Sequence, residues 1–174
     1  MVQTSEIKEI VTSTGETLSS LSMQGPVMLV FLRQFGCVFC KEALIDIAVN
    51  RAMWEKRGVK IVLTHMSDND TANEYFNKFG LHGITHISDE DCELYAKFGL
   101  TKGSAGQLFG LKNWIRGFEI SGSGKAFPSL RQIGDGFQMP GIFLIQNDEI
   151  KQSFIHKTAS DRPDYNGLID CCSD

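Results

Sequence analysis

One stretch decides the fold: VMLVFLRQFGCVFC, residues 27–40. It begins with an unbroken apolar run of strand length, Val27–Leu32, which is typical of a strand buried on both faces of a sheet. Its polar break, Arg33–Gly36, indicates a loop, and the stretch ends in two cysteines, Cys37 and Cys40, spaced C-x-x-C. We therefore expect a buried strand that delivers a pair of thiols to the start of a helix.

Strand and helix patterns alternate on both sides of this stretch. We expect strands at 27–32, 59–65, 84–87, 141–145 and 149–155, and helices at 40–57, 71–80 and 89–98. The last two strands flank a turn and indicate a β-hairpin. This alternation predicts an α/β fold, as one domain over residues 1–174 with a central sheet flanked by helices. The glycine-rich segment 100–138 interrupts the pattern and indicates an insertion before the final β-hairpin.

Composition narrows the functional classes. The 174 residues carry a formal net charge of -4 without a run of basic residues, which argues against binding to nucleic acid or to an anionic membrane surface. The first residues are polar, and the longest apolar run, Val27–Leu32, is far shorter than the roughly 20 residues of a membrane helix. We therefore expect a cytoplasmic protein without a membrane partner.

The C-x-x-C spacing suggests redox chemistry. Cys37 falls at the mouth of the expected helix, where unpaired backbone N–H groups and the helix dipole favour a thiolate. Cys40 lies one turn further in and is close enough to form a disulfide with Cys37. Two other interpretations stay open, in which the cysteines are small hydrophobic residues or bind a metal.

A second cysteine pair, Cys171 and Cys172, ends the chain. Adjacent cysteines are poor partners for a structural zinc site, so we expect no metal. They could instead resolve a disulfide or sulfenic acid formed at Cys37, although a terminal pair is more often inert.

The Met139-Pro140 dipeptide opens the strand expected at 141–145. Proline removes a hydrogen-bond donor from a sheet, so its presence at a strand start needs a reason. A cis peptide bond is one such reason, and an ordinary trans proline is the alternative.

Taken together, FGCVFC (35–40) after a strand and MPGIFLI (139–145) before a hairpin resemble the thioredoxin fold. More narrowly, the chain resembles the peroxiredoxin-like branch of the alkyl hydroperoxide reductase and thiol-specific antioxidant (AhpC/TSA) superfamily, over roughly residues 25–168. The resemblance implies a mixed sheet and a cis Pro140 beside the dithiol, which would orient a substrate sulfur or peroxide. It also implies a thiol-dependent oxidoreductase in which Cys37 attacks a peroxide or disulfide and Cys40 resolves the product.

The chain departs from this family in one motif. The family's P-x-x-x-T/S-x-x-C pattern is not matched, because Gln34 stands at the hydroxyl position counted from Cys37 and Cys37 itself stands there counted from Cys40. An arginine completes the peroxide site in the family. Arg33 is nearest in sequence to the dithiol, and the other arginines considered are Arg116, Arg131 and Arg162.

The resemblance also indicates what accompanies the reaction. It calls for no bound cofactor, because electrons would come from a thioredoxin or glutathione system, and it leaves a homodimer open. An alternative function is a redox-inert, thioredoxin-like module that binds a protein through the insertion.

Overall fold

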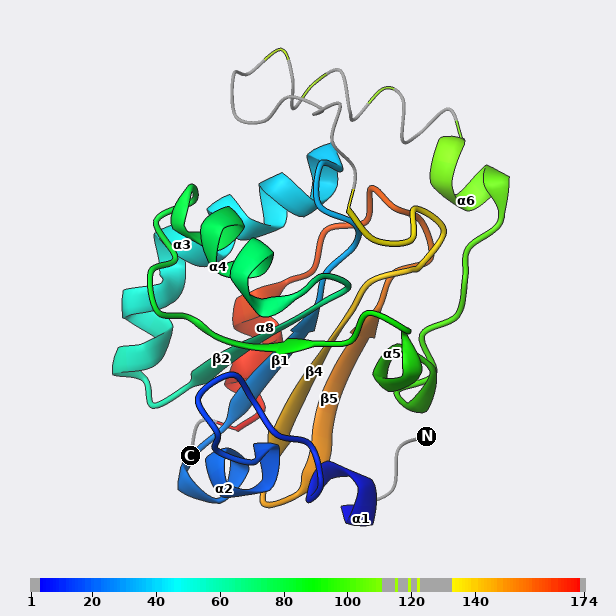
Figure 1. The fold of residues 1–174 in the computed structure, drawn as a ribbon. Helices are drawn as coiled ribbons and strands as arrows, with labels where there is room; N and C mark the ends of the chain where they lie inside the picture. The colour runs from blue at the N-terminus through cyan, green and yellow to red at the C-terminus, as the bar shows by residue number, and fades with distance from the viewer. Residues whose placement is uncertain (1–3, 111–114, 116–118, 120–121, 123–132, 173–174) are drawn as a thin grey trace.

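In the computed structural model, residues 4–110, 115, 119, 122 and 133–172 are described, and a five-stranded sheet forms the middle layer (Figure 1). The strand order is β3-β2-β1-β4-β5. The strands are β1 (Val27–Phe31), β2 (Lys60–His65), β3 (Thr85–Ser88), β4 (Gly141–Gln146) and β5 (Glu149–Ile155). β1 pairs in parallel with β2 and antiparallel with β4, so the sheet is mixed, as predicted.

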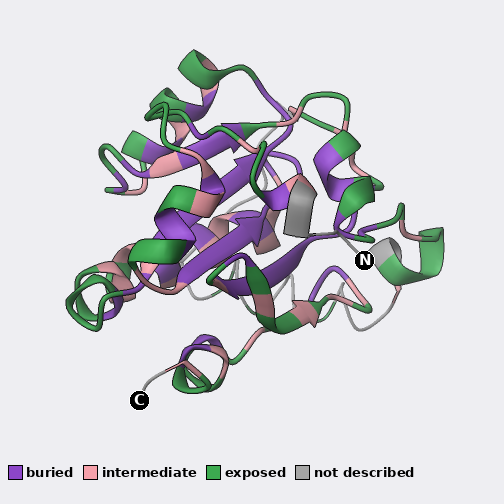
Figure 2. Cartoon of the chain, turned by 90° about the horizontal axis from the view of Figure 1, so that it is seen from below, coloured by how far each residue is buried: buried purple, intermediate pink, exposed green. Residues whose placement is uncertain are grey.

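Helices pack on both faces of the sheet. The helices on one face are α3 (Val38–Lys56), α4 (Asn69–Asn77) and α8 (Tyr165–Asp170). Those on the other are α1 (Thr4–Ile7), α2 (Leu18–Gln24) and α5 (Glu93–Lys97). A further helix, α6 (Ala105–Phe109), contacts the segment that follows β5. Figure 2 shows the resulting layers, with mostly buried inner strands, a largely exposed edge strand β5, and helices whose outer sides are exposed.

β1 confirms the prediction of a strand buried on both faces. Its five residues are all buried. Met28 and Val30 belong to the core cluster under α3, whereas Val27, Leu29 and Phe31 belong to the cluster on the opposite face. This alternation follows from the two-residue period of a strand and places the carboxyl end of β1 directly before the dithiol loop.

α3 is long because one of its faces is apolar at helical spacing. Cys40, Leu44, Ile47 and Trp54 are its buried residues, and they pack on the sheet. The helix ends just before Gly58, whose φ of +82° is a left-handed conformation that favours glycine.

The predicted hairpin is confirmed between β4 and β5. Asn147 and Asp148 form its two-residue turn with φ of 53° and 60°. Positive φ at both positions is the requirement of a type I′ turn, which asparagine and aspartate tolerate better than most residues.

The starts of two helices differ from the sequence prediction. α4 begins earlier, because the Asp68 carboxylate caps it by accepting a hydrogen bond from the Thr71 N–H at 2.8 Å. α5 begins only at Glu93, because the Asp89 carboxylate accepts the N–H groups of Leu94 and Tyr95 instead of joining the helix. About half of the expected insertion at 100–138 lies outside the described residues.

Tyr95 joins α5 to the sheet and provides a test of the packing. Its fully buried side chain donates a hydrogen bond to the carbonyls of Leu32, at 2.6 Å, and Thr64, at 3.1 Å. Tyr95→Phe should therefore lower the free energy of unfolding by about 1–3 kcal/mol, measured by urea denaturation. Tyr165→Phe is the matched control, since that buried ring packs on Trp54. Equal losses in both variants would contradict the role given to the Tyr95 hydroxyl.

Candidate functional site

Cys37 lies at the N-terminus of α3, as the sequence predicts. It is the N-cap residue of this 19-residue helix and its side chain makes no capping hydrogen bond. The thiol is half-buried. Cys37 therefore lies where the first-turn N–H groups of α3 have no partner within the helix.

Cys40 lies one helical turn further along, on the inner face of α3. Its side chain is only 3% exposed. Burial, and secondly the proximity of Cys37, raise the pKa of the Cys40 thiol far above its ordinary value. Both residues are reduced thiols here, and neighbours three apart on a helix have Cβ atoms about 5–6 Å apart. The two thiols therefore differ in access to solvent, because Cys37 is half-buried and Cys40 is buried.

Arg33 supplies the positive charge of the site. Its side chain is 7% exposed and its Nη1 donates a hydrogen bond to the Cys37 sulfur at 3.1 Å. Its Nη2 donates to the Gly136 carbonyl, which fixes the guanidinium. Of the other arginines considered, Arg162 pairs with Asp46, and Arg116 and Arg131 lie outside the described residues. Arg33 thus combines burial, charge and contact with the thiol.

Sequence reasoning missed the residue that supports the dithiol loop, Tyr75 of α4. Its hydroxyl accepts a hydrogen bond from the Gly36 N–H at 3.1 Å, and its ring stacks on Phe35 with centroids 4.2 Å apart. Burial raises the pKa of Tyr75 to about 12, so its phenol stays neutral at physiological pH. In the sequence, Tyr75 differs in no way from the other apolar residues of its helix.

The prediction of a cis bond before Pro140 is wrong. The peptide bonds of the described residues are trans, and Met139-Pro140 is among them. The trans form is the lower in energy by roughly 0.5–1 kcal/mol. Here the Met139 N–H donates to the Thr101 carbonyl at 3.2 Å, and Pro140 simply precedes β4.

A pocket lies between α3, the ends of β1 and β4, and the segment 156–165. It has about 510 Å³ of empty space, its open mouth included, and Cys40 and Pro140 are both in its wall. Its remaining wall is largely apolar, with Phe39, Ile142 and Tyr165 among the lining residues. The structure thus brings Pro140 and Cys40 to one cavity.

The tail pair is not part of this site. Arg57, at the end of α3, donates to the Asp170 carboxylate at 2.6 Å, immediately before Cys171. Because α3 has 19 residues, Cys37 and the tail pair are separated by about 28 Å. Figure 1 shows α3 beginning at the top of the molecule, whereas α8 ends toward its lower side. The structure therefore does not bring Cys171 and Cys172 to Cys37, and their resolving role stays a prediction.

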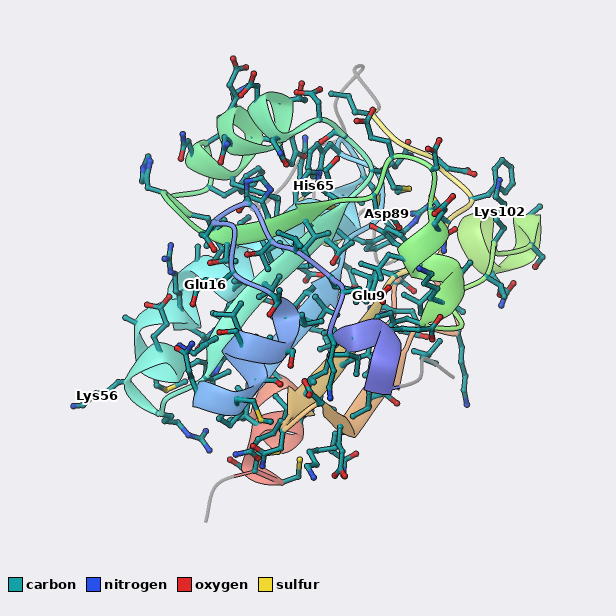
Figure 3. All side chains as sticks on the ribbon, turned by 60° about the horizontal axis from the view of Figure 1, so that its bottom comes forward. Glu9, Glu16, Lys56, His65, Asp89 and Lys102 are labelled. Carbon is teal, nitrogen blue, oxygen red and sulfur yellow. The ribbon has the colours of Figure 1, made fainter. Side chains whose placement is uncertain are left out.

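His65 belongs to a buried network behind the dithiol loop. Its Nε2 lies 2.9 Å from His86 Nδ1, its Nδ1 lies 3.1 Å from the Ser67 hydroxyl, and its ring faces Phe35. Figure 3 labels His65 among the side chains of the molecule. Burial lowers the pKa of His65 to about 3, and burial also lowers the pKa of His86. Both imidazoles are therefore neutral in the folded protein at pH 7.

This network predicts a loss of stability in acid. Because the folded pKa of His65 lies below the ordinary value of about 6.5, the unfolded state takes up protons first as the pH falls. The stabilisation is complete above pH 6.5 and is lost progressively toward pH 3. His65 alone should cost about 2–3 kcal/mol of unfolding free energy between pH 7 and pH 4.5.

Denaturant unfolding at the two pH values measures this effect. His65→Gln should show a shallower pH dependence than wild type, whereas His82→Gln, at an exposed position, should match wild type. An unchanged slope in His65→Gln would show that other groups cause the acid sensitivity.

The described residues provide neither a metal site nor a membrane-spanning helix. In that part of the chain, no cluster of three or more His, Cys, Asp or Glu side chains could hold a metal ion. The helices described there are also too short or too polar to span a membrane.

Comparison with known proteins identifies one family. The sequence model of the AhpC/TSA antioxidant enzymes matches residues 46–160, a segment that begins after the dithiol. The thioredoxin-like protein AAED1 of Arabidopsis thaliana, described as chloroplastic, is 23% identical over 162 residues. The alignment covers 89% of this chain and 65% of that protein, so the chain spans about two-thirds of its relative's length.

Solved peroxiredoxin structures share the fold. A PrxQ mutant of Xylella fastidiosa superposes with a TM-score of 0.66 at 12% identity, over 98% of this chain and 91% of that one. Peroxidoxin BcpB of Mycobacterium tuberculosis superposes with a TM-score of 0.63 at 13% identity, over 94% and 89%. The predicted thioredoxin fold is thereby confirmed.

Proposed function

We propose, because the chain belongs to the AhpC/TSA antioxidant enzyme family, that it is a thiol-dependent oxidoreductase that reduces peroxides or disulfides through Cys37 and Cys40. The observation that carries the proposal is the hydrogen bond from the Arg33 guanidinium to the Cys37 sulfur at the N-terminus of α3. A guanidinium and a helix N-terminus both stabilise a thiolate, which is the reactive form of cysteine.

The proposed reaction has two steps. The Cys37 thiolate attacks a peroxide oxygen, the O–O bond breaks, and an alcohol or water leaves as Cys37 becomes a sulfenic acid. The Cys40 thiol then attacks the sulfenic sulfur and releases water, which leaves a Cys37–Cys40 disulfide. With a disulfide substrate, the first product is a mixed disulfide on Cys37 and the leaving group is a thiol.

The surroundings suggest how a substrate is held. Arg33 donates to the reacting sulfur and Pro140 forms part of the neighbouring pocket wall. Gln34, at the position where the family carries a hydroxyl, is 8% exposed and packs close to Gly136. A thioredoxin or glutathione system would return two electrons to the disulfide.

Peptide mass spectrometry of wild type treated with hydrogen peroxide tests the proposal. The expected product is a dominant Cys37–Cys40 disulfide with one equivalent of oxidant. A chain that stays fully reduced while free cysteine oxidises would instead indicate the redox-inert module.

A further inference from the structure

The pocket beside the dithiol is asymmetric with respect to the two sulfurs. Cys40 is among its lining residues and Cys37 is not. Cys40 is almost completely buried and forms part of the wall of this cavity. The empty space of about 510 Å³ includes the open mouth, so the cavity can be entered from solvent. The oxidation of Cys37 therefore does not explain why the pocket is lined by Cys40.

The same asymmetry applies to the leaving groups of a Cys37–Cys40 disulfide. An attack on the Cys37 sulfur would expel the Cys40 thiolate into surroundings that oppose its charge, as its raised pKa indicates. An attack on the Cys40 sulfur would expel the Cys37 thiolate, which Arg33 and the N-terminus of α3 stabilise. Thiol–disulfide exchange is faster when the better-stabilised thiolate leaves. Cys40 is thus the electronically favoured point of attack.

We propose that a low-molecular-weight thiol enters this pocket and reduces the enzyme by attacking Cys40. This inference rests on the proposed function. The incoming thiolate forms an S–S bond with Cys40, the Cys37–Cys40 bond breaks, and its electron pair goes to the Cys37 sulfur. A second thiol attacks the bound thiol's sulfur, releases a disulfide and returns Cys40 to its thiol form. In total, two small thiols become one disulfide and the protein gains two electrons and two protons.

The polar atoms of the pocket indicate the kind of thiol. Arg33 Nε and His156 Nδ1 are buried and have no hydrogen-bond partner among the described residues, and both side chains line the pocket. Burial lowers the pKa of His156 to about 4, so its ring is neutral. The Arg33 N–H requires an acceptor oxygen. A peptide-like thiol that carries a carbonyl or carboxylate fits this requirement.

The wall and rim agree with such a ligand. Phe39 and Tyr165 offer apolar contact, and the Arg162–Asp46 pair brings both signs of charge to the lining. Cys40 is 3% exposed and lies in the wall of this cavity, so a protein donor would have to insert its thiol into the pocket, whereas a small thiol can enter as a whole. The geometry therefore favours a small thiol over a dithiol protein as the electron donor.

The test uses the full chain with its disulfide formed by diamide, so that it does not depend on the physiological oxidant. Glutathione, the probe, is added for milliseconds, the reaction is quenched in acid, and the first adduct is located by peptide mass spectrometry. The expected adduct lies on Cys40. An adduct on Cys37 would overturn the proposal, and this measurement needs no variant.

Pocket access is tested with Ala159→Leu, since Ala159 is 2% exposed and lines the pocket. The rate constant for reduction by glutathione should fall at least about tenfold. The matched control is Ala52→Leu, on the exposed side of α3, which should keep the wild-type rate. Equal rates in both variants would overturn the route through the pocket. Failure of peroxide to form the disulfide would instead count against the proposed function, while the diamide experiment could still be run.

Discussion

Replacing Cys37 with serine should abolish turnover with peroxides and disulfides alike, by at least about a thousandfold in kcat/KM. Serine is not ionised at neutral pH, so the charge that Arg33 and the start of α3 stabilise is lost along with the nucleophile. Steady-state assays with hydrogen peroxide, cumene hydroperoxide and a small disulfide measure the effect. Cys92→Ser is the control, because Cys92 lies before α5 and away from the pocket. Retained activity in Cys37→Ser would overturn the mechanism.

Cys40→Ser should behave differently from Cys37→Ser. The first attack remains, so one equivalent of oxidant should leave a sulfenic acid or mixed disulfide on Cys37 that can be trapped with dimedone and identified by mass. Continued turnover without accumulation of this species would mean that another thiol resolves Cys37.

The second large effect is expected at Arg33. A hydrogen bond to a charged group contributes about 1.5–3 kcal/mol, so Arg33→Met should slow alkylation of Cys37 by roughly ten- to a hundredfold at pH 7. The second-order rate constant for labelling of Cys37 with iodoacetamide at pH 7 measures the effect.

Two further variants separate the contributions of charge and packing. Arg33→Lys keeps the charge and should recover part of the rate, although it cannot hold Cys37 and Gly136 together in the same way. Arg57→Met, at the far end of α3, should react like wild type. An unchanged rate of Cys37 alkylation in Arg33→Met would show that the guanidinium has no part in the mechanism.

The elements of the fold could be predicted where a single chain segment contains the whole signal. The apolar run at Val27 indicated a strand buried on both faces, and Gly58 indicated the end of a long helix. Helix starts were harder to predict from the sequence, because a carboxylate such as Asp68 competes with neighbouring side chains for hydrogen bonds from the same backbone N–H groups. The outcome of that competition depends on packing as well as on spacing.

The site was predictable only in part. The C-x-x-C spacing placed Cys37 and Cys40 at the start of α3, and proximity in sequence favoured Arg33. Tyr75 and the pocket had no local signal, since they arise when α4 and the segment after β5 pack around the loop. The trans bond before Pro140 could not be predicted from the sequence either, because the two isomers differ little in energy and tertiary contacts decide between them.

The ion pair between Arg57 and Asp170 has a practical consequence for labelling. It holds the exposed Cys171 a full helix length from the dithiol, so a label on Cys171 should lie outside the pocket and away from Cys37. Attachment of a fluorophore or a solid support through Cys171 gives the chain a handle that leaves its reaction centre untouched.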